Sequence, residues 1–319
     1  MSLLPRFAPK VPFPGILFFL WIPLFACNQV HQGSQRGPKK APATPPKRIL
    51  PKRIVSLAPS ITESLAFLGL TSKLVAVTRY CDYPPEVKDL PKVGGYIDPS
   101  LEAIVRVAPD LILGLGEHHE TIDKLRRAGL RCLALDERNL EGIFSSLLRL
   151  GQICGVTERA RKKVLALRTT ITKTQALVRG KGTPMVLVSV GRHAGQGAVG
   201  KVYAAGPKTF LGQLIEIAGG KNLAPTTGAA FPPLSTEGLL RLNPEVLFDI
   251  VPGMAEQGIL GTQILSDWKK LPQLQAVRQG RVYVLGANWA VRPSPRFPKI
   301  LEAFVHGLHP DLAQPSEKK

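Results

Sequence analysis

Two acidic side chains, Glu102 and Glu237, occupy the same place in two similar segments of the sequence. The stretch SLEAIVRVAPDLIL (100–113) aligns with STEGLLRLNPEVLF (235–248) at a constant offset of 135, with apolar positions coinciding. Each acid falls near the start of a predicted helix, where the helix dipole stabilises a carboxylate. That local role is one interpretation. The other is a pair of docking acids, because two equivalent carboxylates on two similar lobes can bind a partner with two similar basic sites.

Aromatic side chains accompany both segments. Tyr80 and Tyr96 lie in a loop rich in prolines and glycines, and Tyr96 precedes Glu102 by six residues, as Phe231 precedes Glu237. Trp289 and Arg292 lie in the polar-aromatic stretch NWAVRPSPR. Facing loops of this kind form an apolar slot with a few polar groups, which is the usual make-up of a small-molecule site. The alternative is that each ring only anchors its own loop.

Other motifs give little support for catalysis. GQGAVG (195–200) fits a dinucleotide fingerprint in its letters, but neither a strand nor a helix adjoins it directly, so we interpret it as a mobile glycine loop. In EHHE (117–120), adjacent histidines on an extended segment point in opposite directions, which favours pocket lining over a metal site. We find no acid–base pair or nucleophile motif, and we predict no enzyme activity, no cofactor and no metal site.

The elements that must position these residues alternate between strands and helices, which is typical of parallel sheets covered on both faces. Residues 158–179 contain neither Gly nor Pro and would form a helix about 33 Å long. We therefore predict an α/β protein with two Rossmann-like lobes joined by one long helix. The predicted boundaries are a first lobe at 53–157, the joining helix at 158–180, a second lobe at 181–310 and a tail at 311–319.

The N-terminal segment predicts export. Arg6 and Lys10 precede an apolar run, 11–26, that is interrupted by prolines and ends in LFAC. We predict a signal peptide at 1–26, a lipid-modified Cys27 as the mature terminus, and a flexible basic linker at 27–52. An ordinary signal peptide or an uncleaved anchor are the alternatives.

The formal charge of +19 has two sources. The first 62 residues carry nine basic and no acidic side chains, and the remaining excess is spread over the body of the chain. Basic linker residues can contact anionic lipid or stay solvated. Aromatic residues make up only 6% of the chain and no nucleic-acid motif is present, so we expect no nucleic-acid partner.

Four segments resemble the cobalamin-binding branch of the periplasmic binding proteins for ABC importers: RIVSLAPSITE, YCDYPPEVKDLPKVGGYIDPSLEAIVRVAPDLIL, STEGLLRLNPEVLF and NWAVRPSPR. The likeness covers about residues 53–309. It implies the class III fold, a ligand between two lobes, and permease docking through Glu102 and Glu237. The ligand contacts it implies are Tyr80, Tyr96, Phe231, Trp289 and Arg292. The sequence departs from the family at Leu115 and Glu117–His119, where a pocket tryptophan is expected.

These observations predict a monomeric, exported, lipid-anchored solute-binding protein of the cell envelope that delivers a corrinoid to an ABC importer permease dimer. A ferric siderophore or haem receptor of the same fold is the alternative, because Arg79, Arg192 and Arg292 would suit an anionic ligand. A two-lobed metal-cluster or nucleotide enzyme is a more distant alternative.

Overall fold

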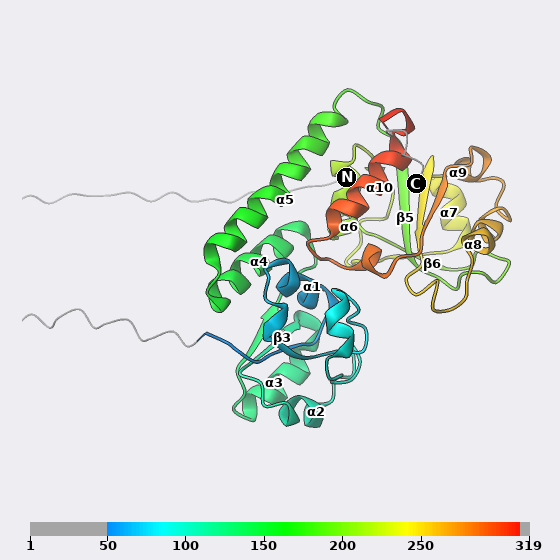
Figure 1. Ribbon diagram of the computed structural model, residues 1–319. Helices are drawn as coiled ribbons and strands as arrows, with labels where there is room; N and C mark the ends of the chain where they lie inside the picture. The colour runs from blue at the N-terminus through cyan, green and yellow to red at the C-terminus, as the bar shows by residue number, and fades with distance from the viewer. Residues whose placement is uncertain (1–49, 313–319) are drawn as a thin grey trace, which may run out of the picture. The chain divides into compact units, whose positions relative to one another are not determined.

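The computed structural model describes residues 50–312 and contains two sheets (Figure 1). The first sheet is wholly parallel, in the order β2-β1-β3-β4. Its strands are short and mostly buried, and they comprise β1 (Ile54–Ser56), β2 (Leu74–Val77), β3 (Leu111–Leu115) and β4 (Cys132–Leu135). The parallel sheet predicted for the first lobe is therefore confirmed.

The second sheet is mixed, in the order β10-β9-β5-β6-β8, with β7 also pairing with β5. Its parallel part agrees with the prediction, but β6 runs antiparallel to β5 and β8 antiparallel to β6. The glycine loop lets the chain turn back directly beside β5, so no crossover helix is needed there. The strands are β5 (Met185–Gly191), β6 (Val202–Ala204), β7 (Lys221–Asn222), β8 (Pro233–Leu234), β9 (Val246–Ile250) and β10 (Val282–Leu285).

The helices surround the two sheets. In the first lobe they are α1 (Pro59–Phe67), α2 (Leu101–Arg106), α3 (His119–Arg127) and α4 (Leu140–Cys154). In the second they are α6 (Phe210–Ile217), α7 (Thr236–Leu242), α8 (Gly261–Trp268), α9 (Gln275–Arg278) and α10 (Phe297–Leu308). Short 3-10 turns include η2 (Pro85–Asp89), η3 (Gly116–His118), η4 (Asn288–Val291) and, at the end, η5 (Pro310–Leu312).

The joining helix is α5 (Thr157–Leu177), the longest helix in Figure 1. Its 21 residues give a length of about 32 Å, close to the predicted span. It packs against α4 of the first lobe and contacts α6 of the second. Gly180, at a φ of 78°, adopts the left-handed conformation that suits a chain leaving a helix.

A continuous apolar core runs between the lobes through α4, α5, α6 and α10. In it the Phe144 ring of α4 meets the Phe297 ring of α10 edge to face, with centroids 6.1 Å apart. Main-chain contact reinforces the junction, because Phe210 N–H donates to Arg138 O at 3.0 Å. The two lobes are thus packed against each other as well as tethered by one helix.

None of the helices within residues 50–312 is both long and apolar enough to cross a membrane. The predicted signal peptide, Cys27 and most of the linker lie outside the described residues, as does most of the predicted tail.

Candidate functional site

The candidate site is built from the segments that follow the strands of the first sheet. In parallel sheets, ligands bind beyond the carboxyl ends of the strands. Tyr80 follows β2, Glu117 follows β3, and Glu137 follows β4. The second lobe meets the same edge through the segment after β10, which carries Trp289 and Arg292.

Arg292 joins the two lobes. Its guanidinium donates to Glu63 Oε1 at 3.0 Å, to both carboxylate oxygens of Asp82, and to Tyr80 O at 3.1 Å. Burial opposes the charged form of Arg292, but the hydrogen bonds to Asp82 and Glu63 outweigh it and raise its pKa. The same contacts lower the pKa of Asp82 against the opposing effect of burial. Arg292 is only 9% exposed, so its charge is compensated inside the protein.

Further contacts strengthen this junction. Glu63, 2% exposed on α1, also accepts from Ser294 Oγ at 2.6 Å and from Arg296 Nη1 at 3.1 Å. Asn288 Nδ2 donates to Asp82 at 3.2 Å. The guanidinium of Arg296 lies 4.0 Å from the centre of the Tyr83 ring, a cation–π contact. The segment NWAVRPSPR thus builds a contact between the lobes.

Arg192 is unavailable to a ligand. It donates to Asp249 at 2.8 Å and to Asp267 at 2.7 Å, and its side chain is 2% exposed. Asp267 also accepts the main-chain N–H groups of Gly195 and Gly197. The predicted mobile glycine loop is therefore tethered at its start by a buried carboxylate.

Tyr96 is held at both ends by the segment after β3. Its hydroxyl donates to Glu117 Oε1, and its carbonyl accepts from His118 Nε2 at 2.8 Å. His118 Nδ1 accepts from Leu115 N–H at 2.9 Å, which assigns the ring hydrogen to Nε2. Burial, then the bond to Glu117, raises the pKa of Tyr96, so the phenol stays protonated. Glu117 and His118, which depart from the family pattern, thus position Tyr96, a predicted ligand contact.

The two histidines of EHHE differ in burial, although they lie on a 3-10 turn and the start of a helix rather than on the extended segment predicted. His118 is 4% exposed and its ring meets the Tyr96 ring edge to face at 4.9 Å, whereas His119 is exposed at the first position of α3. Within residues 50–312 no group of three His, Cys, Asp or Glu side chains is arranged to hold a metal ion.

The other predicted aromatic contacts differ in exposure. Tyr80 is 54% exposed and Phe231 is 41% exposed, while Trp289 is partly buried in η4 with Arg296 5.8 Å from its ring centre. Arg292 brings Tyr80 and the Trp289 segment together. Among the described residues, no hydrogen bond or ring contact joins Phe231 to Tyr96.

Sequence reasoning missed Glu137, which follows β4 and is 2% exposed. Its Oε1 lies 3.5 Å from Ser64 Oγ, and its Oε2 has no hydrogen-bond partner within residues 50–312. Burial raises its pKa to about 8, helped by the nearby charges of Glu63 and Glu117. At neutral pH Glu137 is therefore mostly protonated. The only signal in the sequence was its position directly after an apolar strand.

The 135-residue repeat holds in atomic detail. Ser100 and Ser235 both cap their helices by accepting an N–H three residues on. Ala108 and Asn243, which correspond at this offset, share a rare positive φ of 42° and 43°. Glu102 and Glu237 are both exposed at equivalent positions of α2 and α7.

The repeat also includes the acid before each strand. Asp110 accepts main-chain N–H groups from Lys52 and Arg53, and its counterpart Glu245 accepts that of Met185. Each carboxylate therefore ties the start of one parallel strand to its neighbour.

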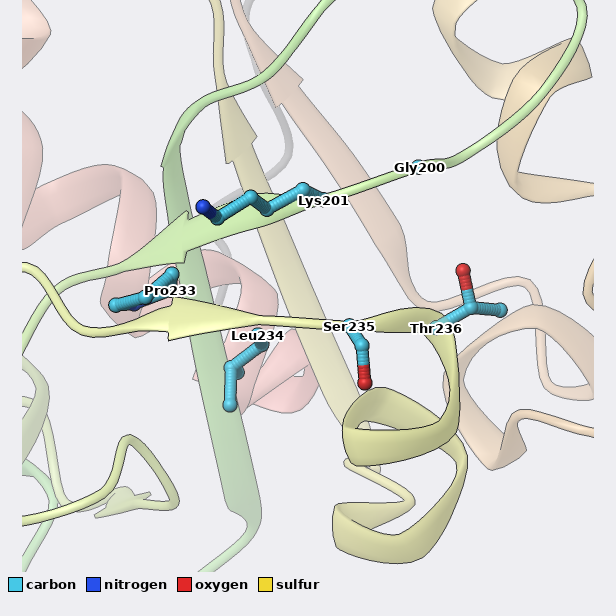
Figure 2. Close-up of a pocket in the computed structure, with 6 residues that line it drawn as sticks. All are labelled: Gly200, Lys201, Pro233, Leu234, Ser235 and Thr236. Carbon is cyan, nitrogen blue, oxygen red and sulfur yellow. The ribbon is translucent and has the colours of Figure 1, made fainter.

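A surface cavity of about 490 Å³ lies at the start of α7 (Figure 2). Figure 2 shows Lys201 directly before β6, Pro233 on the neighbouring strand β8 and Thr236 where α7 begins. The cavity is lined by Thr236, the residue before Glu237, and by none of the predicted aromatic contacts, so it is not the predicted ligand site. A second cavity, of about 660 Å³, borders the inter-lobe junction and is lined in part by Glu63, Phe67, Tyr83 and Arg296.

Comparison with known proteins settles the family. The sequence pattern described as "Periplasmic binding protein" matches residues 54–289. The chain belongs to this family. Its members are solute-binding proteins rather than an enzyme class, and they act outside the cytoplasm. The chain is accordingly a substrate-binding protein of the ABC-importer type with the two-lobed class III fold.

Similar proteins are named for different ligands, among them vitamin B12 and heme. The vitamin B12-binding protein of Vibrio parahaemolyticus is 29% identical over 258 residues, covering 80% of this chain and 89% of the relative. An uncharacterized ABC transporter substrate-binding lipoprotein of Bacillus subtilis is 25% identical, covering 82% and 81%. The structure of a periplasmic heme binding protein from Pseudomonas aeruginosa superposes with a TM-score of 0.72 at 29% identity, covering 84% and 96%.

Proposed function

We propose that this periplasmic binding protein captures a corrinoid between its two lobes and delivers it to the permease of an ABC importer. The observation that carries the proposal is the aromatic edge: Arg292 joins the Trp289 segment to Tyr80 O, and Glu117 and His118 fix Tyr96 at the carboxyl edge of the same first-lobe sheet. A flat macrocycle gains affinity from aromatic contact over a large area and needs few polar partners. The vitamin B12-binding relative supports the same ligand class.

A haem or ferric siderophore is the second candidate, and the likeness to a heme binding protein favours it. The argument from arginines is weaker than the sequence indicated. Arg192 and Arg292 are buried and paired with carboxylates, and Arg79, which remains exposed, lies 3.4 Å from Asp98. Of these three predicted anion contacts, none is an unpaired cation, which favours a ligand of low net charge.

We further propose that Glu102 and Glu237 dock onto the two permease subunits. Both acids are exposed on helix tips that match in capping and backbone conformation. An importer built from two like subunits would offer a like basic site to each. A carboxylate in the first turn also stabilises its helix through the helix dipole. This role is compatible with docking, because an exposed carboxylate in the first turn can do both.

Lipid attachment at Cys27 completes the proposal, and the lipoprotein relative from Bacillus subtilis supports it. A lipid-modified terminus and a basic linker together form a two-signal anchor, whereas the linker alone binds weakly. We expect Cys27→Ser to release most of the protein from membranes on fractionation. Retention of the Ser variant in the membrane fraction at the parent level would count against the lipid anchor.

Titration calorimetry of the purified protein with cyanocobalamin, haem and a ferric siderophore tests the ligand. We expect cyanocobalamin to bind more tightly than the other two. Tight binding of haem or of the siderophore with no cyanocobalamin binding would replace the first proposal with the second. Binding of none of them would reject both.

A further inference from the structure

Glu117 occupies a central place at the carboxyl edge of the first sheet. The strand order is β2-β1-β3-β4. Asp82 after β2 and Arg138 after β4 both contact the second lobe, the first through Arg292 and the second through Phe210 N–H. Glu117 follows β3, between these two points of contact on the same edge. Its side chain is exposed at the same edge to which the second lobe attaches.

The charge of Glu117 is not compensated in the way that its neighbours' charges are. Glu63 and Asp82 are paired with arginines from the second lobe. Arg138, after β4, attracts Glu117 electrostatically, but it donates its hydrogen bonds to Asp136, at 2.9 and 2.6 Å. Glu117 accepts one neutral hydrogen bond, from the Tyr96 hydroxyl, on Oε1. Its Oε2 accepts none from residues 50–312.

Tyr96 fixes the orientation of this carboxylate. The Tyr96 carbonyl is bound to His118, so the ring that donates to Glu117 is itself anchored. Behind them Glu137 is buried and mostly neutral, and it adds little negative charge of its own. The edge therefore presents one oriented carboxylate beside an aromatic ring.

We infer that Glu117 determines ligand specificity by accepting hydrogen bonds from N–H groups on the rim of the macrocycle. This inference rests on the proposed corrinoid function. A rim of amides can donate to Glu117, whereas a rim of carboxylates repels it. The site therefore selects macrocycles with a neutral amide rim over macrocycles with an acidic rim.

Two corrinoids with the same ring system test this directly. Dicyanocobinamide carries a rim of amides, and dicyanocobyrinic acid carries carboxylates in their place. We expect the full-length protein to bind the amide form at least about thirtyfold more tightly than the carboxylate form. In Glu117→Gln, this ratio of the two affinities should fall by about tenfold. Glu120→Gln is the matched control, because it makes the same change at an exposed position of α3 and should leave the ratio unchanged.

Tyr96→Phe provides a second variant that keeps both the ring and the Glu117 charge. It removes only the hydroxyl that orients Glu117, so the ratio of the affinities for the amide and carboxylate forms should fall by about threefold. If the affinity ratio is unchanged in Glu117→Gln, or falls as much in Glu120→Gln, the inference about Glu117 is wrong. The proposal that the protein binds a corrinoid would still stand. Failure of the parent to bind either corrinoid, with tight binding of haem, instead rejects the proposed ligand class.

Discussion

The two lobes share one structural unit, a capped helix followed by a buried strand, and differ in the elements that surround it. In both, a serine-capped helix with an exposed acid leads through a left-handed residue into a buried strand, at α2–β3 and at α7–β9. Only the second lobe places the antiparallel strand β6 and the glycine loop beside this unit, and there the cavity of Figure 2 opens next to the helix. The matching helix tips suit a task that both lobes perform alike, while the differing strand ends suit two unlike sides of one ligand site.

The largest effect should come from removing both repeated acids. Glu102→Ala combined with Glu237→Ala should abolish transport and leave corrinoid affinity intact. Truncating one partner of a buried interfacial charge pair costs about 2–5 kcal/mol, so losing both should weaken docking far more than tenfold. Binding of the variant to the cognate permease, measured alongside its thermal unfolding, checks this.

Glu158→Ala is the control for helix stability, because Glu158 is an exposed first-turn acid paired with Arg161, as Glu102 is with Arg106. Removing such an acid should cost about 0.3–1 kcal/mol of stability. If the double variant docks normally and only melts slightly earlier, like Glu158→Ala, the acids act on their helices alone.

The contact between lobes can be broken at Arg292. Arg292→Met leaves Asp82 without its guanidinium partner and Glu63 with fewer donors, so urea unfolding should show a loss of about 3 kcal/mol. Arg138→Met removes an exposed pair with Asp136 and should leave the free energy of unfolding nearly unchanged. Similar small losses in both variants would mean that the apolar core between α4 and α10 alone holds the lobes together.

Glu137 should make the stability of the first lobe fall as pH rises from its ordinary pKa of 4.5 to about 8. Its pKa of about 8 in the folded protein exceeds the ordinary value of 4.5, so folding favours the protonated form. The stability from this group is present at acid pH and is lost as pH rises towards 8, at about 1.4 kcal/mol per pKa unit. Glu137→Gln should flatten the fall in unfolding free energy between pH 5 and pH 9. A slope equal to that of the parent protein would assign the pH dependence to other groups.

The smallest expected effect is a difference in ligand affinity between variants at the two repeated aromatic positions, Tyr96 and Phe231. Tyr96 is anchored to Glu117 and His118, whereas Phe231 is 41% exposed and lacks such contacts. A pre-oriented ring loses less freedom on binding, so Tyr96→Ala should weaken cyanocobalamin binding by about tenfold and Phe231→Ala by about threefold. Calorimetry on both variants checks this. A larger loss of cyanocobalamin affinity in Phe231→Ala than in Tyr96→Ala would mean that Phe231, and not Tyr96, is the stronger ligand contact.

Much of the fold could be predicted from the sequence, because it depends on local patterns. The apolar strands, the Gly- and Pro-free helix and the offset of 135 predicted two α/β lobes and α5 to within a few residues. The antiparallel placement of β6 and β8 could not be predicted, since strands of two or three residues carry too little pattern to fix their direction.

The sequence by itself determined the repeated capped helix, the exposed acids at its two copies and the aromatic loops, since each depends on residues close together in the chain. Only the tertiary structure decided which charges remain unpaired. The sequence predicted Arg192 and Arg292 as cations suited to an anionic ligand, and the structure pairs them with acids 57 and 229 residues away in sequence. Burial likewise favours the protonated form of Glu137, whereas Glu117 remains exposed with one hydrogen bond, from Tyr96. Coulomb interactions and desolvation depend on distance in space, and that distance is set only when the lobes pack together.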